Sequence, residues 1–202
     1  PKIRIIETVW DPGDFVHGAV NAVQTNIALD ACTGDWCLYL QADEVLHEKY
    51  LPVLREKMER YLDVSEVEGF LFDYVHFYGS YDLYQTAHNW YAREIRVVRN
   101  GIGVRSWESA QGFRIDGRKL RVVPAGAEIY HYGWVRPPVH MMKKQIALSS
   151  VHHDSEWVKS RYPDEDAPFD FGSLKTCRRF EGTHPAVMRQ RIEATNWDVK
   201  PG

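Results

Sequence analysis

The sequence contains few cysteines, no long apolar run and no strong excess of charge of either sign. Its three cysteines are odd in number and none pair at C-x-x-C spacing, so we expect reduced thiols in a cytoplasmic protein rather than a disulfide framework. No stretch of about 18 apolar residues is present and the first residues do not form a charged and then apolar leader, so we expect neither a membrane span nor a signal peptide. A formal net charge of -3 argues against a nucleic acid partner.

The 202 residues are sufficient for one substantial hydrophobic core. Because 44% of them are hydrophobic and 13% are aromatic, we expect a single domain over residues 1–202. Residues 1–150 are expected to form its core, and residues 151–202 a loop-rich, partly helical C-terminal extension. The chain begins at Pro1, and Lys2–Trp10 (KIRIIETVW) predicts a buried strand, so the expected fold is cut short on its N-terminal side.

The hydrophobic pattern then changes between helix and strand periods. Asp14 is a predicted cap for a helix whose apolar residues recur at helical spacing up to Ala31, with Gly34 placed to end it. The apolar run Trp36–Leu40 predicts a strand covered on both faces. His47–Leu62 carries an apolar stripe with charges elsewhere, which predicts an amphipathic helix.

The second half of the chain is expected to be richer in strands. Strands are predicted at Gly69–Phe77, Glu94–Arg99 and Ala127–Tyr132, and a hairpin at Asp116-Gly117. Helices are predicted at Val139–Val151 and Pro185–Ala194. Together these elements predict an α/β fold, in which a mixed sheet is flanked by helices.

Two carboxylates, Asp43 and Glu44, follow the predicted strand Trp36–Leu40. Sites in open α/β sheets lie beyond the carboxyl ends of strands. A carboxylate there can hold Mg²⁺ or Mn²⁺, and such a metal can bridge phosphate oxygens and stabilise a departing diphosphate. The alternative is that both residues cap the next helix. The tetrapeptide Gln41–Glu44 alone does not decide between these two roles.

Three segments of the sequence resemble family 2 glycosyltransferases, which have the GT-A fold. Asn26–Leu46 (NIALDACTGDWCLYLQADEVL) is similar to the helix, Gly-Asp pair and strand that lead to the D-x-D metal motif of that family. Arg93–Arg99 (REIRVVR) resembles the strand that follows the acceptor region in that family. Ile129–Lys143 (IYHYGWVRPPVHMMK) resembles the family's late segment that contains a histidine. The resemblance implies a GT-A-like sheet and inverting, metal-dependent transfer of a sugar from a nucleotide-diphosphate donor to an acceptor hydroxyl.

The sequence departs from the family in two respects. The first aspartate of the D-x-D motif is Gln41 here, so a neutral amide replaces one acidic contact to ribose or metal. The opening β-α-β unit that recognises the nucleoside base in the family is absent from this sequence. The base, the sugar and the acceptor, a carbohydrate or another hydroxyl compound, are therefore left open.

The resemblance also implies roles for individual residues around the donor. It makes Asp43 the ligand of Mn²⁺ or Mg²⁺, with Glu44 beside it as a second metal residue, and His131 a ligand from the opposite edge of the site. Gln41 and Asp43 are also expected to contact the donor. It places Asn26 near the donor sugar or phosphate. The alternatives are a packed core role for His131 and helix-to-sheet hydrogen bonding for Asn26.

An inverting transfer needs a base that takes the proton from the acceptor hydroxyl. Glu108, in Ser106–Ser109 (SWES), stands where related enzymes place a carboxylate after the strand that is Arg93–Arg99 here. The alternative is a glutamate of a surface loop. Asp73 and Asp82 are the substitutes for the base.

Aromatic and basic residues near these segments are candidates for binding the two substrates. Flat rings suit the apolar faces of sugars, although most aromatic residues belong to cores. Guanidinium groups match phosphate oxygens, although arginines on a strand often form a solvated face. The acceptor-binding candidates are Trp107 and Trp134, and the phosphate candidate is Arg136.

Two function classes are left open. The first is the glycosyltransferase, and the second is a non-catalytic relative that binds nucleotide or carbohydrate without turnover. Binding of a divalent cation at Asp43 discriminates between them. An incomplete sheet would also expose the edge of the predicted strand Lys2–Trp10, and a homodimer is predicted to form through that edge.

Overall fold

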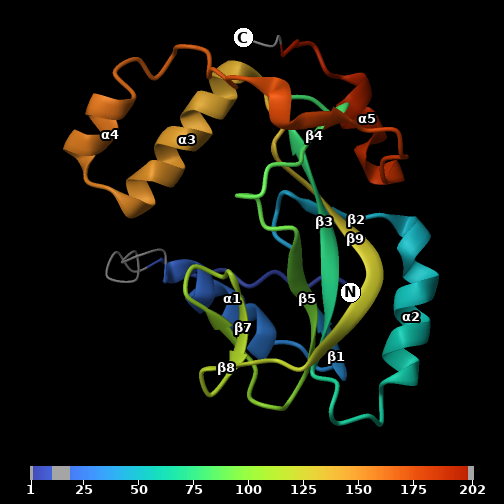
Figure 1. Cartoon of the computed structure of the whole chain (residues 1–202). Coiled ribbons are helices and arrows are strands. Elements are labelled where there is room, and N and C mark those ends of the chain that lie inside the picture. The colour runs from blue at the N-terminus through green and yellow to red at the C-terminus, as the bar shows by residue number, and fades with distance from the viewer. Residues whose placement is uncertain (1, 11–18, 200–202) are drawn as a thin grey trace.

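The computed structural model describes residues 2–10 and 19–199, in which a curled mixed sheet is flanked by helices (Figure 1). The seven-stranded main sheet has the order β1-β5-β3-β4-β10, and β9 pairs in parallel with β3 and antiparallel with β2. Its strands are β1 (Trp36–Leu38), β2 (Glu44–Leu46), β3 (Gly69–Tyr78), β4 (Leu83–Gln85), β5 (Arg93–Arg99), β9 (Val122–Trp134) and β10 (Cys177–Arg179). A separate small sheet consists of β6 (Arg105–Trp107), β7 (Gly112–Ile115) and β8 (Arg118–Lys119).

The helices lie on both sides of the main sheet. They are α1 (Val20–Asp30), α2 (Leu51–Arg60), α3 (Pro138–His152), α4 (Ser155–Arg161) and α5 (Arg189–Glu193). Short 3₁₀ turns are found at Glu48–Tyr50, Leu174–Thr176 and Ala186–Met188. In Figure 1, α2 stands beside β9 on one side, and α1 lies with β7 and β8 on the other.

Neighbouring residues of β5 face two different cores. Val97 packs with Phe70 and Phe72 of β3 and with Leu54 of α2. Val98 packs in a second cluster against the small sheet. This alternation follows from the strand period of two residues. Burying each of these large side chains stabilises the fold by about 1.5–3 kcal/mol.

Most of the predicted elements are confirmed, some with different bounds. The helix that precedes Gly34 is α1, and the predicted strands of the second half are β3, β5 and β9. The hairpin prediction is also confirmed, because Ile115 pairs with Arg118 across Asp116 and Gly117. These two residues have φ angles of 47° and 79°, as a type I′ turn requires. The predicted cap Asp14 lies outside the described residues.

The predicted strand Lys2–Trp10 is wrong. These residues belong to no helix or strand of the described chain, and Ile5 and Val9 are 81% and 97% exposed. β-branched residues favour a strand only where a neighbouring strand and a core receive them. The homodimer predicted through this strand edge therefore loses its structural basis.

Three further expectations are corrected. β1 is at the edge of the main sheet and Leu38 is 43% exposed, so this strand is not covered on both faces. The helix predicted from His47 begins at Leu51, because His47 instead caps a 3₁₀ turn by accepting a hydrogen bond from the Lys49 N–H. The C-terminal extension contains α4, which was not expected and is capped by Asp154.

Candidate functional site

Asp43 and His131 lie beside each other at the carboxyl end of β9. Asp43 is in the turn between β1 and β2, and its carbonyl accepts a 2.8 Å hydrogen bond from the Tyr132 N–H. Glu44, the next residue, pairs with His131 across β2 and β9. As a result, Asp43 Oδ2 lies 3.7 Å from His131 Nε2, a separation too long for a hydrogen bond.

Lys144 of α3 neutralises Asp43. Its Nζ donates hydrogen bonds to Asp43 Oδ2 at 2.9 Å and to the Gly133 carbonyl at 2.8 Å. Burial raises the pKa of Asp43, but the hydrogen bond and positive charge of the Lys144 ammonium lower it, and the net pKa lies below its ordinary value. Asp43 is therefore a carboxylate at neutral pH.

Asp43 and His131 both approach Gly133 at the position where a side chain would begin. A Cβ atom at this position would lie 2.6 Å from Asp43 Oδ2 and 2.6 Å from His131 Nε2, closer than real Cβ atoms approach other atoms. Any side chain at Gly133 would therefore displace both groups. We call the position that a Cβ atom of Gly133 would take, between Asp43 and His131, the Gly133 hollow.

His76 of β3 stands behind His131. The two residues pair in the parallel register of β3 and β9, and their Nδ1 atoms lie 3.0 Å apart. His76 Nε2 lies 2.7 Å from the Tyr91 carbonyl oxygen. Burial lowers the pKa of His76 to about 4, so its ring is neutral at physiological pH.

Glu44 forms a buried ion pair with Arg96. The Arg96 Nε and Nη2 atoms donate to Glu44 Oε2 at 3.0 Å and Oε1 at 2.8 Å, and the two side chains are 2% and 0% exposed for Arg96 and Glu44 respectively. The Tyr74 hydroxyl and the Gln41 N–H donate one further hydrogen bond each, at 2.8 and 3.1 Å. Four donors therefore occupy the Glu44 carboxylate, which anchors the turn that carries Asp43.

A pocket of about 390 Å³ opens beside this ion pair. It is lined by Gln41, Tyr91, Glu94, Arg96, Ser109, Ala110 and Gln111. Burial raises the pKa of Glu94 above its ordinary value, although Arg96 counteracts the shift. We call this space the Glu94 pocket; it offers side-chain amides, a hydroxyl and a carboxylate to a polar ligand.

The remaining predicted site residues are dispersed. Glu108 is exposed, has a φ angle of 50° and immediately precedes Ser109 of the Glu94 pocket. Trp107 is 40% exposed beside the Arg114 guanidinium. Asn26 Oδ1 accepts a 2.8 Å hydrogen bond from the Ser106 N–H, which supports its structural alternative.

Trp134 and Arg136 follow His131 along the chain. The Trp134 ring packs among aromatic rings, with Trp90 at 5.5 Å and Tyr78 at 5.6 Å between centroids. Arg136 is exposed in the turn between β9 and α3. Trp134 is thus partly buried within an aromatic group, whereas Arg136 is exposed.

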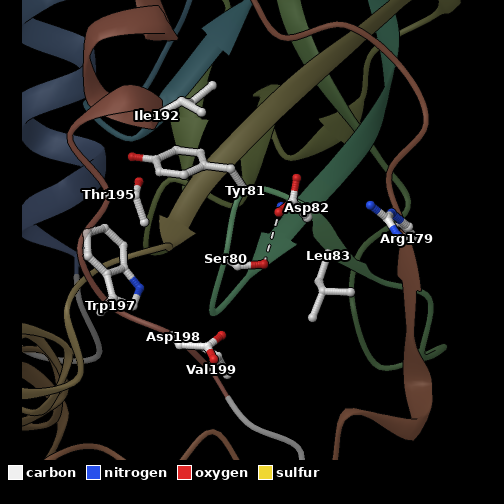
Figure 2. A pocket seen from close by; sticks show the side chains of 10 residues that line it. All are labelled: Ser80, Tyr81, Asp82, Leu83, Arg179, Ile192, Thr195, Trp197, Asp198 and Val199. Atoms are coloured by element: carbon white, nitrogen blue, oxygen red, sulfur yellow. Dashed lines mark hydrogen bonds between the residues drawn. The ribbon is translucent and has the colours of Figure 1, made fainter.

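A second pocket, of about 430 Å³, lies between the β3–β4 turn and the C-terminal segment (Figure 2). Asp82, a substitute candidate for the base, lines it with Tyr81 and Trp197. This pocket shares no lining residue with the Glu94 pocket. Asp82 is thus placed in a different pocket from the one beside Glu44 and Arg96.

The sequence interpretation missed His76, Lys144, Gly133 and Glu94. His76 lies within a predicted strand that carries Tyr74 and Tyr78 on the same face, but the strand pattern does not show its partner. Lys144 reaches Asp43 across 101 residues of sequence. Gly133 acts through the lack of a side chain, which no spacing rule detects.

The spacing of Asp43 and His131 fits two ligands of one divalent cation, which would replace Lys144 at Asp43 Oδ2. Ligand distances near 2.1 Å place two ligands of one cation about 3 to 4 Å apart, a range that includes the 3.7 Å between Asp43 Oδ2 and His131 Nε2. The Gly133 hollow adjoins both atoms. Glu44 does not fit, because Arg96 occupies both its oxygens. In residues 2–10 and 19–199, no three His, Cys, Asp or Glu side chains form a metal-binding group by themselves.

No protein-family model matches this chain, and no curated protein matches it significantly in sequence. None of the helices in the described ranges is long and apolar enough to cross a membrane. Functional assignment therefore depends on the geometry around Asp43.

Proposed function

We propose that the chain is the catalytic part of a GT-A-type glycosyltransferase, which moves a sugar from a nucleotide-diphosphate donor to an acceptor hydroxyl. One observation carries this proposal: Asp43 Oδ2 and His131 Nε2 lie 3.7 Å apart beside the Gly133 hollow. These are the two residues to which the resemblance to family 2 glycosyltransferases gives the donor metal. A curled mixed sheet with helices on both sides is compatible with the GT-A fold.

The donor diphosphate is proposed to bind beside Asp43 and His131. These residues would hold Mn²⁺ or Mg²⁺, which would supply positive charge to neutralise the departing diphosphate. Lys144 supplies a second positive charge at the same place, since its Nζ is 2.9 Å from Asp43 Oδ2. Arg136 is exposed after β9 and offers a guanidinium fork to phosphate oxygens.

The transferred sugar and the acceptor are proposed to occupy the Glu94 pocket. Gln41, Ser109 and Gln111 can exchange hydrogen bonds with sugar hydroxyls there. Two carboxylates compete for the role of base, Glu108 beside the pocket and Glu94 in its wall. Burial raises the pKa of Glu94, and a raised pKa makes a carboxylate a stronger base.

Calorimetric titration tests the proposal. Uridine and guanosine diphosphates are titrated into the wild-type chain and into Asp43→Ala, with and without Mn²⁺. The proposal expects binding of at least one diphosphate that requires both Mn²⁺ and Asp43. Diphosphate binding that is independent of Mn²⁺ and unchanged in Asp43→Ala would overturn it.

A non-catalytic nucleotide-binding or carbohydrate-binding domain is the second candidate. Its support is that Asp43 and Glu44 already have positive partners within the chain, Lys144 and Arg96. A diphosphate would then be held by basic side chains without a metal. Metal-independent binding that weakens in Arg136→Ala would favour this candidate over the glycosyltransferase.

A further inference from the structure

His76 is a buried histidine outside the residues proposed to bind the donor. It is 3% exposed, and its ring meets the His131 ring edge to face with centroids 5.0 Å apart. Both of its nitrogens have partners, His131 Nδ1 at 3.0 Å and the Tyr91 carbonyl oxygen at 2.7 Å. A polar ring buried with both nitrogens paired has a defined orientation.

The direction of these hydrogen bonds follows from the chemistry of the carbonyl group. A carbonyl oxygen only accepts, so His76 Nε2 must carry a hydrogen and donate it to Tyr91. Burial disfavours a second proton on the same ring, which leaves His76 Nδ1 with a lone pair. The 3.0 Å contact between the two Nδ1 atoms then requires that His131 Nδ1 donates.

We propose that His76 is a positioning residue that holds the His131 proton on Nδ1 and thereby presents Nε2 of His131 to the Gly133 hollow. Nε2 is the nitrogen that lies 3.7 Å from Asp43 Oδ2. A histidine that binds a metal through one nitrogen commonly donates its other N–H to a partner that fixes its tautomer. The consequence for cation binding rests on the proposed function, whereas the position of the proton does not.

Removal of His76 has a specific chemical consequence. Without an acceptor at Nδ1, the proton of His131 is free to move to Nε2, where the Asp43 carboxylate attracts it. The hydrogen would then lie in the Gly133 hollow between the two groups. Loss of a partner that orients a metal-binding histidine weakens metal binding by about 10- to 100-fold.

The test is nitrogen-15 NMR of the histidine side chains in the metal-free chain at pH 8. Wild type is compared with His76→Phe, which keeps a ring but no acceptor, and with His76→Asn, whose amide oxygen can accept from His131. His184→Phe is the matched control. It removes a different histidine, which is partly buried and pairs with the Tyr132 hydroxyl instead of with His131.

We expect His131 Nδ1 to be protonated in wild type, His76→Asn and His184→Phe, and to lose this proton in His76→Phe. Calorimetry should then show Mn²⁺ affinity at least tenfold weaker in His76→Phe than in His76→Asn. An unprotonated His131 Nδ1 in wild type would overturn the inference even if His76→Phe does not fold, and so would a protonated Nδ1 in folded His76→Phe. If the tautomer is as expected but no diphosphate binds, the proposed function fails and the positioning role of His76 stands.

Discussion

Replacing Gly133 by alanine tests the site with a single methyl group. The added Cβ would lie 2.6 Å from Asp43 Oδ2, 2.6 Å from His131 Nε2 and 2.9 Å from His131 Cε1. Ordinary contacts of a Cβ atom begin at 3.4 Å, so Asp43 and His131 must each retreat by about 0.8 Å, the difference between 3.4 and 2.6 Å. The methyl group therefore displaces both side chains that we assign to the cation.

The expected effects on stability and binding differ in size. Overpacking of this kind costs about 1–3 kcal/mol, which lowers Tm by roughly 2–12 °C in a chain of this size. The chain therefore stays folded at room temperature. Displacing both ligands should weaken Mn²⁺ binding by at least the roughly 10- to 100-fold loss seen when a metal ligand loses its orientation.

Calorimetry with Mn²⁺, and then with Mn²⁺ and a nucleoside diphosphate, measures the effect. Gly34→Ala is the matched control, because its Cβ would meet only the Trp36 carbonyl oxygen at an ordinary 3.5 Å. Thermal unfolding of both variants separates folding from binding. If folded Gly133→Ala binds Mn²⁺ as tightly as wild type, the cation does not lie between Asp43 and His131 and our assignment of the site is refuted.

Three further predictions concern charge. Lys144→Met removes the ammonium that competes with a cation for the Asp43 carboxylate, so calorimetry should find Mn²⁺ binding tighter by about 1 kcal/mol, or roughly fivefold. Lys143→Met is the control: it breaks a 3.1 Å ion pair on the exposed surface and should leave the Mn²⁺ affinity unchanged. If Glu94 is the base, Glu94→Gln should lower kcat for sugar transfer by about 100-fold or more with little change in donor affinity, whereas Glu108→Gln should leave kcat nearly unchanged. A loss of kcat in Glu108→Gln but not in Glu94→Gln would assign the base to Glu108. The pKa of His76 is lowered to about 4, so the unfolded chain takes up this proton first as the pH falls, and the contribution of His76 to stability is fully present above about pH 6.5 and is lost toward pH 4. In denaturant titrations at several pH values, His76→Asn should remove about 2–3 kcal/mol from the change in unfolding free energy between pH 6.5 and pH 4. An unchanged dependence of the unfolding free energy on pH would contradict the lowered pKa of His76.

Local sequence patterns were sufficient to predict those strands that other helices and strands cover on both faces. β3 and β9 have long β-branched and aromatic runs, and both are buried by the helices and strands around them. Lys2–Trp10 has a similar composition but is exposed. The difference is not in the segment itself, because a strand is stable only when another strand satisfies its backbone groups.

The candidate site was predictable only in part. Asp43 could be placed by its position after a strand, and the resemblance to glycosyltransferases added His131. Glu44 looked equivalent to Asp43 in sequence, but Arg96, which takes both its oxygens, is 52 residues away along the chain. The spacing of residues in the sequence does not reveal the contact between Arg96 and Glu44, nor the contact between Lys144 and Asp43.

The two neighbouring carboxylates have different environments, and this difference bears on function. Glu44 is the first residue of β2 and its side chain is fully buried against Arg96, so removing either partner would leave an unpaired buried charge at a cost of about 3–5 kcal/mol. Asp43 is 27% exposed and shares its charge with Lys144, a flexible side chain that is itself 25% exposed. A ligand can therefore replace the partner of Asp43 without unfolding the turn, whereas it cannot replace the partner of Glu44. The buried pair fixes the turn so that the partly exposed Asp43 carboxylate keeps its place opposite His131, and we therefore propose Asp43 rather than Glu44 as the ligand of a cation.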